Sequence, residues 1–196
     1  RYGIDTLDRK YANKDALRDR LWLRKDFKPI IAYVGRLDSQ KGVHLIHHAI
    51  FYALRHNAQF VLLGSSPDPH INHQFWNLKR HLNDSPDCHL ELGFDEDLSH
   101  LIYAGADMVV MPSLFEPCGL TQMIALKYGT VPIVREVGGL KDTVFGIESA
   151  MHRAIALWYA YPDDFRRLMI HGMNYDYSWY RPGQDYLNIY EHIRCK

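Results

Sequence analysis

The apolar residues of this chain fall into two alternating patterns, and their alternation predicts a parallel α/β sheet. Residues 30–34 form a continuous apolar run between Pro29 and Gly35, which is typical of a strand buried on both faces. Residues 43–56 instead carry apolar side chains three and four positions apart, as on one face of a helix. Strand, loop and helix recur about five times in this order, which predicts an open parallel sheet with helices on both faces.

The same alternation sets the remaining expected elements. We expect a short helix capped by Asn13, in which Leu17 and Leu21 share one face. Further strands are expected at residues 60–63, 89–92, 108–111 and 131–134. Further helices are expected at residues 71–82, 97–104, from 119 onward, 151–158, 163–173 and 178–194.

Composition restricts the class of protein without defining its chemistry. The chain has 196 residues, of which 47% are apolar, so it can bury a sizeable core. Its 23 Lys and Arg balance 23 Asp and Glu, which gives no basic footprint for nucleic acid and no polybasic membrane patch. Three widely spaced cysteines favour a reducing compartment, and no apolar run approaches membrane-spanning length. Because the chain begins without methionine, we expect a piece of a longer soluble, cytoplasmic protein.

Residues 112–142 carry the most informative candidate chemistry. The strand expected at residues 108–111 leads into a turn that holds Glu116, and Gly119 then opens an apolar helix. The first amides of a helix lack internal partners and lie at its positive end, so Gly119, Leu120 and Thr121 predict an anion site. Because Glu116 would repel a nearby anion, we expect it to face a neutral, hydroxylated part of the same ligand. A sugar nucleotide has this polarity.

A second loop supplies cations at the end of the first strand. Arg36 and Lys41 lie five positions apart, between the strand and the following helix, so both can reach one diphosphate. Arg offers a planar fork of donors, whereas Lys offers a point charge. The alternative is a solvated surface pair, which is the commoner fate of an isolated Arg and Lys.

With these residues the chain resembles the bacterial and plastid glycogen/starch synthases, in their cyanobacterial and starch-synthase-like branch. The motifs that carry the resemblance cover nearly the whole chain in order: RLDSQKGVHLI (36–46), LLGSSPDP (62–69), SHLIYAGAD (99–107), EPCGLTQ (116–122), KYGTVPIVR (127–135), GGLKDTVF (138–145) and YDYSWYRPGQDYLNIY (175–190). Two loops, near residues 6–7 and 145–146, are shorter here than in the family.

The resemblance implies a GT-B glycosyltransferase, which has two facing Rossmann-like domains with the active site between them. Residues 1–174 would form the carboxyl-terminal, nucleotide-sugar-binding domain. Residues 175–196 would form a helix that crosses back to the absent amino-terminal domain. We therefore expect this helix to expose an aromatic face in the present chain, made of Trp179, Tyr186, Leu187, Tyr190 and Ile193.

The resemblance also implies roles for three catalytic residues. Arg36 and Lys41 would bind the phosphates of ADP-glucose and stabilise the departing ADP. Glu116 would bind glucose hydroxyls and position the anomeric carbon. Many related retaining enzymes carry a second Glu eight positions later, where this chain has Ile124, in agreement with the glycogen/starch synthase pattern.

Further ligand contacts are implied at two places. Cys118, Gly119, Leu120 and Thr121 would contact phosphate and sugar, mostly through backbone amides, although a packed thiol is an open alternative for Cys118. Phe94 stands where relatives place a Tyr against adenine, so stacking is kept and the phenol hydrogen bond is lost. Gly93 would let the base approach the backbone.

We expect no metal and no cofactor besides the donor substrate. Asp95, Glu96 and Asp97 offer the Asp-x-Asp pattern of metal-dependent glycosyltransferases, but acids are favoured at the start of any helix, so we interpret them as scaffold. The 12 histidines include close pairs, yet no Cys or carboxylate completes a metal set.

The sequence thus predicts the donor domain of a glycogen/starch synthase, which transfers glucose with retention from ADP-glucose to the non-reducing end of an α-1,4-glucan. We expect the isolated domain to be inactive, and a plant or algal version to lie in the plastid stroma. Two alternatives stay open, namely a GT-B glycosyltransferase that uses a UDP-sugar and a non-catalytic nucleotide- or glucan-binding module.

Overall fold

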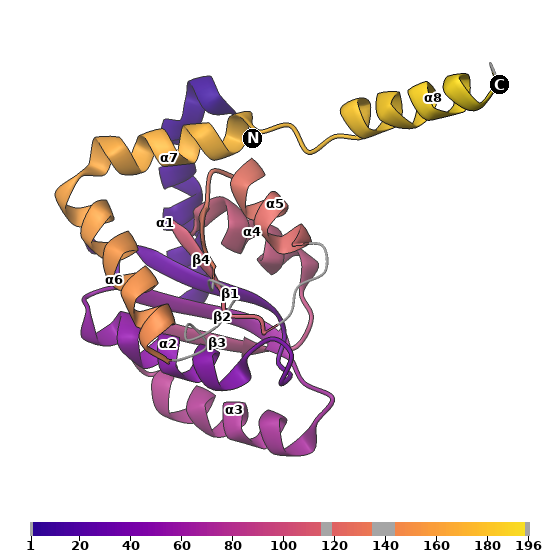
Figure 1. The fold of residues 1–196 in the computed structure, drawn as a ribbon. Helices are drawn as coiled ribbons and strands as arrows, with labels where there is room; N and C mark the ends of the chain where they lie inside the picture. Colours follow the sequence, from indigo (N-terminus) through magenta and orange to yellow (C-terminus); the bar gives the residue numbers. More distant parts are fainter. Residues whose placement is uncertain (1, 115–118, 135–143, 195–196) are drawn as a thin grey trace.

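The computed structural model describes residues 2–114, 119–134 and 144–194, and it contains the expected open parallel sheet. Five strands lie in the spatial order β3-β2-β1-β4-β5 (Figure 1). Their bounds are β1 Ile30–Arg36, β2 Gln59–Ser65, β3 Cys88–Leu92, β4 Met108–Met111 and β5 Val131–Val134. Every neighbouring pair is parallel. The predicted fold class and all five strand positions are confirmed.

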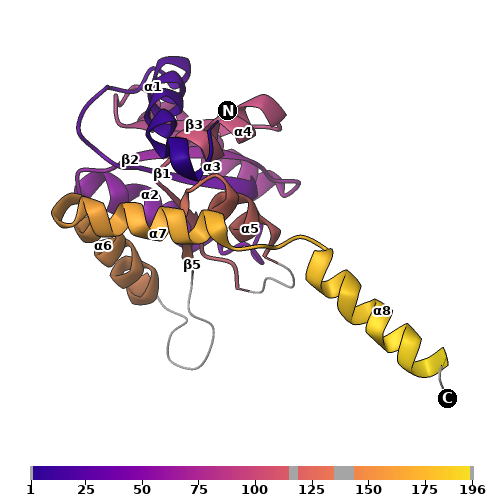
Figure 2. The same cartoon turned by 90° about the horizontal axis from the view of Figure 1, so that it is seen from above.

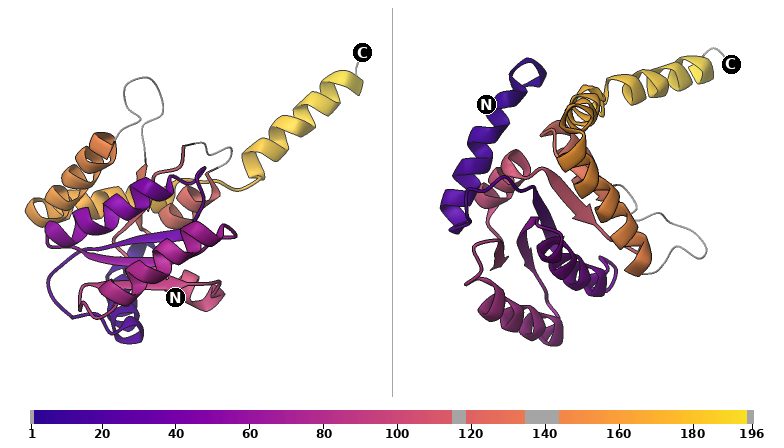
Figure 3. Two further views of the ribbon diagram at one scale, coloured as in Figure 1. Left: turned by 90° about the horizontal axis from the view of Figure 1, so that it is seen from below. Right: turned by 90° about the vertical axis from the view of Figure 1, so that its left-hand side faces the viewer.

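Helices cover both faces of the sheet (Figure 3). One face packs against α2 (Val43–Arg55), α3 (Pro69–Leu82) and α6 (Val144–Ala160). The other packs against α1 (Lys10–Leu21), α4 (Glu96–Gly105) and α5 (Leu120–Lys127). Alternation within β1 explains the two layers, because Ile31 and Tyr33 enter the first core whereas Ile30 and Ala32 enter the second.

The last two helices of the chain follow α6, and the first of them contacts the edge strand β5. Helix α7 (Pro162–Asn174) packs on α5 and α6. Helix α8 (Tyr180–Arg194) follows a short link and stands away from the body of the molecule (Figure 2). No helix in the described part of the chain is long and apolar enough to cross a bilayer.

The expected cap at Asn13 is wrong, because α1 begins earlier. A 3-10 helix, η1 (Ile4–Arg9), runs directly into α1, and the N-cap residue is Arg9. Asn13 lies inside α1, where its side-chain amide donates to the Arg9 carbonyl at 3.2 Å. The helix at residues 151–158 is likewise longer than expected, since α6 already begins at Val144.

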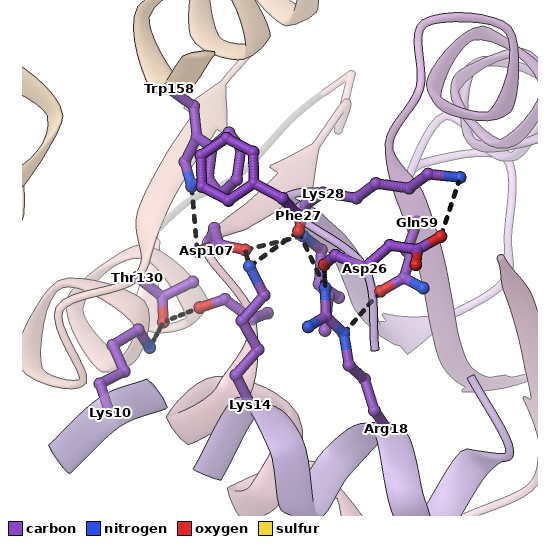
Figure 4. A network of polar contacts seen from close by, with 12 residues as sticks. Lys10, Lys14, Arg18, Asp26, Phe27, Lys28, Gln59, Asp107, Thr130 and Trp158 are labelled. Carbon is purple, nitrogen blue, oxygen red and sulfur yellow. Dashed lines mark hydrogen bonds and ion pairs between the residues drawn. The ribbon is translucent and has the colours of Figure 1, made fainter. Parts of the chain in front are cut away.

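A buried polar network ties α1 to the amino ends of β1 and β4 (Figure 4). The Lys14 ammonium lies 2.7 Å from Asp107 Oδ2, and the two side chains are 8% and 5% exposed. The Ile30 amide donates to the same carboxylate at 2.7 Å, and Trp158 Nε1 donates to it at 3.1 Å. Burial lowers the pKa of Lys14, while the Asp107 charge and hydrogen bond act in the opposite direction. One carboxylate therefore joins two strands and two helices.

We predict that Asp107→Ala lowers the free energy of unfolding by about 3–5 kcal/mol, because it leaves the Lys14 charge buried without its partner. The matched control is Asp8→Ala. Asp8 pairs with Arg166 at the surface, where its side chain is 77% exposed, and such pairs contribute at most about 1 kcal/mol. Urea unfolding of both variants measures the difference, and similar losses would contradict a structural role for the buried pair.

Candidate active site

The strand order creates a topological switch point between β1 and β4. The chain leaves β1 for α2 on one face of the sheet, and it leaves β4 for α5 on the other face. In open parallel sheets, ligands bind in the crevice outside the carboxyl ends of such strands. The loops that follow β1 and β4 contain most of the residues that the sequence singles out.

These two loops are in direct contact. The Leu114 amide donates to the Gln40 carbonyl at 2.8 Å. Gly42 has a left-handed backbone with φ of +69°, and a β-carbon there would lie 2.4 Å from the Pro112 carbonyl oxygen. The residue must be glycine for the loops to approach so closely. The loop that carries Lys41 is thereby held against the loop that leads to α5.

Asp38 links the two predicted cations, which the sequence analysis did not foresee. Its carboxylate lies 3.6 Å from the Arg36 guanidinium and accepts a hydrogen bond from the Lys41 amide at 2.9 Å. The Arg36 side chain stays 65% exposed. An acid two positions after Arg36 was the only signal of this role. The carboxylate shapes the loop while the Arg36 guanidinium remains accessible to a ligand.

The helices that begin at the switch point have glycine N-caps, unlike their neighbours. Helix α2 begins after Gly42 and α5 after Gly119, which has φ of +71°. By contrast, Asp68 caps α3 and Asp95 caps α4 through side-chain oxygens that accept backbone amides. A glycine N-cap has no side chain to accept the first amides of its helix, and it adds no negative charge. The two helix ends therefore suit an anion.

A hollow of about 250 Å³ lies beside these loops, at the carboxyl ends of β1 and β2 and the start of α4. Arg36, Gly93 and Phe94 all line it. The Phe94 side chain is 88% exposed, so one face of its ring is accessible for stacking. The structure thus brings three predicted residues together around one hollow. Arg36 lines this hollow and also pairs with Asp38 of the loop that follows β1.

The predicted residues Leu120 and Thr121 form the first turn of α5. Leu120 is 61% exposed, and the contact that the resemblance implies for it is through its backbone amide. The Thr121 side chain lies near the Tyr103 phenol of α4. Burial raises the pKa of Tyr103, and the Thr121 side chain acts in the opposite direction. The Gln122 side chain, which sequence reasoning missed, lies over Gly119, where a β-carbon would be 2.5 Å from its Oε1.

Two predicted site residues lie outside the described part of the chain. They are Glu116 and Cys118. The roles that the resemblance implies for them stay predictions.

Asp95 has a structural role at the start of α4. Its Oδ1 accepts the Leu98 amide at 2.8 Å, and its Oδ2 pairs with Arg20 at 2.7 Å. Both oxygens are therefore occupied by the protein. Among the described residues, no group of three or more His, Cys, Asp or Glu is placed to hold a metal.

Known proteins share both the sequence and the fold of this chain. A family model described as "Glycosyl transferases group 1" matches residues 16–146. Glycogen synthase 1 of Nitrosococcus oceani is 60% identical over 217 positions, which span 99% of this chain and 45% of the relative. Glycogen synthase 1 of Synechococcus sp. (strain JA-3-3Ab) is 58% identical over 98% of the chain and 44% of the relative.

A solved structure matches the fold closely. The catalytic domain of starch synthase IV from Arabidopsis thaliana, bound to ADP and acarbose, superposes with a TM-score of 0.91 at 38% identity. The match covers 98% of this chain and 44% of that one. The chain therefore spans less than half the length of these relatives. Because the alignment with the Nitrosococcus protein is longer than the 196 residues of the chain, that relative carries residues within the matched region that this chain lacks.

The parallel sheet, the paired loops at its switch point and these matches together show that the chain belongs to the group 1 glycosyl transferase family.

Proposed function

We propose that this chain is the donor-binding part of a glycogen or starch synthase. The whole enzyme would transfer glucose from ADP-glucose, with retention of configuration, to the non-reducing end of an α-1,4-glucan. One observation carries the proposal: the loop of Arg36 and Lys41 lies against the loop that opens α5. The names of the relatives and the ADP in the starch synthase IV structure support this choice of reaction and nucleotide.

The diphosphate would lie between the cationic loop and the amino ends of α2 and α5. Charge grows on the leaving ADP as the glycosidic bond breaks, and fixed donors around that charge lower the barrier. Arg36, Lys41 and the first amides after Gly119 are the donors we assign to it. Because these groups carry the compensating charge, the step that we propose involves no metal and no cofactor.

The nucleoside would occupy the hollow beside the loops. Adenine would stack on the exposed ring of Phe94, and the backbone at Gly93 would border the base. Arg36 lines the same hollow, so the nucleoside and the diphosphate would both lie near its side chain. This arrangement supports a nucleotide donor, while the choice between ADP and UDP rests on the relatives.

At the sugar, Glu116 would bind the glucose hydroxyls, and the backbone near Cys118 would contact the sugar and phosphate. Retention could proceed through a covalent intermediate or through attack on the face that the leaving group vacates. The chain has Ile124 where many retaining relatives carry a second carboxylate. We favour attack on the vacated face, with ADP close to the incoming hydroxyl.

The acceptor glucan would need a second domain. Helix α8 exposes the predicted Tyr186, Leu187, Tyr190 and Ile193 together with Tyr180 and Ile189, and Trp179, which directly precedes the helix, is exposed as well. An exposed apolar face of this kind is typical of an interaction surface. We assign it to the amino-terminal domain of the same protein, so the isolated chain would be inactive. The bacterial origin of the relatives favours a cytoplasmic location.

We predict that Arg36→Ala/Lys41→Ala weakens ADP binding by about a hundredfold, because it removes two charge-assisted contacts. The matched control is Arg24→Ala/Lys25→Ala, an exposed pair that precedes β1 at the opposite end of the sheet. Calorimetric titration of the intact protein with ADP and with UDP measures both effects. Equal ADP affinity in the two variants would exclude the phosphate role, and tighter binding of UDP than ADP would favour the UDP-sugar alternative.

We predict that Glu116→Ala in the intact protein slows glucan elongation by about a hundredfold or more, because it removes a group that positions the reacting sugar. Glu96→Ala is the control, since the Glu96 side chain is 75% exposed at the start of α4. Incorporation of labelled glucose from ADP-glucose gives the rate. A Glu116→Ala enzyme that elongates near the wild-type rate would reject the assignment.

We predict that Gly42→Ala lowers the free energy of unfolding by about 1–3 kcal/mol and also weakens ADP binding, because the added carbon must push the two loops apart. Gly3→Ala is the control, because Gly3 has φ of −140° and nothing within 4 Å of an added β-carbon. Thermal unfolding and ADP titration measure the two effects. Wild-type ADP affinity in Gly42→Ala would mean that loop contact does not shape the site.

A further inference from the structure

Lys10 is a buried amine that the proposed reaction does not use. Its side chain is 3% exposed. Four oxygen atoms lie within hydrogen-bond distance of its Nζ, namely Thr130 Oγ1 at 2.7 Å and the carbonyls of Ala104 at 3.0 Å, Tyr103 at 3.1 Å and Tyr128 at 3.2 Å. Figure 4 shows the bond to Thr130. An ammonium has three donors and accepts nothing, so this set of acceptors suits it. Burial lowers the pKa of Lys10 to about 7, while the Asp107 charge acts in the opposite direction.

The carbonyls around Lys10 belong to the ends of two helices. Tyr103 and Ala104 lie in the last turn of α4, and Tyr128 is the C-cap of α5. Carbonyls at a helix end lack internal partners and carry partial negative charge, so an amine that donates to them stabilises both helices. The Tyr2 phenol donates to the Tyr128 carbonyl at 2.6 Å. The first residues of the chain thus fix the carboxyl end of α5.

The opposite end of α5 is the proposed phosphate site. The helix has eight residues and is therefore about 12 Å long, so it moves as one rigid unit. At the carboxyl end of α5, the Tyr103 carbonyl of α4 accepts from Lys10 and from the Thr130 hydroxyl. Loss of the Lys10 contacts would weaken the link between the carboxyl ends of α4 and α5, and it would leave the Tyr2 phenol and the Thr130 hydroxyl to hold them together.

We propose that Lys10 is a positioning residue for the diphosphate: by holding the carboxyl ends of α4 and α5 together, it sets the place of Gly119 and the first amides of α5. The inference rests on the proposed function, because it assumes that the diphosphate binds at this helix end. Lys10 itself does not touch the ligand.

The test compares Lys10→Met with Arg18→Met in the intact protein. Arg18 is an equally suitable buried cation of α1, 5% exposed, but it donates to Gln59 Oε1 and to the carbonyls of Asp26 and Lys28 rather than to α4 or α5. Each variant is titrated with ADP and with adenosine, which lacks the diphosphate. We expect Lys10→Met to weaken ADP binding about fivefold and adenosine binding less than twofold, a difference that general loosening of the fold would not produce. Arg18→Met should leave the ratio of the two affinities unchanged.

Two results would overturn the inference. One is wild-type ADP affinity in folded Lys10→Met, and the other is an equal loss of ADP and adenosine binding. If Lys10→Met does not fold, Tyr2→Phe decides, because it removes one bond to the Tyr128 carbonyl and keeps Lys10. About a twofold, ADP-selective loss supports the inference, and no loss rejects it. A wild-type protein that binds ADP, but not through Arg36 and Lys41, would overturn the proposed function itself.

Discussion

The candidate site depends on the close contact between two loops at the carboxyl edge of the sheet. The Leu114 amide bonds to the Gln40 carbonyl, and Gly42 leaves no room for a β-carbon beside the Pro112 carbonyl. These loops follow β1 and β4, which are neighbours in space and distant in sequence. The contact brings a cationic loop to the start of α5, so that two weak anion-binding features can act on one ligand.

The two ends of the parallel strands have different roles. At the amino ends of the strands, the Asp107 carboxylate and the Lys14 ammonium pair inside the protein, which fixes the strands and leaves little for a ligand. At the carboxyl edge, carboxylates cap α3 and α4, whereas glycines begin α2 and α5. An acidic cap beside a diphosphate would repel it, and a glycine does not. The choice of N-cap therefore distinguishes α3 and α4 from the two helices that we assign to the diphosphate.

The sequence was sufficient for the strands because each is a short apolar run between loop residues, and this signal is local. Asn13 does not cap α1, although its residue type favours that position. Tertiary contacts outweigh this local preference, because Lys10 and Lys14 lie one turn apart and both face the interior, and α1 starts at Lys10. Local patterns could not predict the contact between Gly42 and Pro112, nor the oxygen atoms that surround Lys10. In both cases the contacting residues are remote from each other in the chain. The donor residues were found through motifs, and the structure explains three of them, Arg36, Gly93 and Phe94, by placing them around one hollow.

The most direct measurement is a crystal structure of the intact protein with ADP bound. The account predicts a diphosphate in contact with Arg36, with Lys41 and with the amides after Gly119, and an adenine ring against Phe94. A diphosphate bound away from α5, or one that Arg36 and Lys41 do not reach, would contradict the central claim that this loop pair forms the donor site.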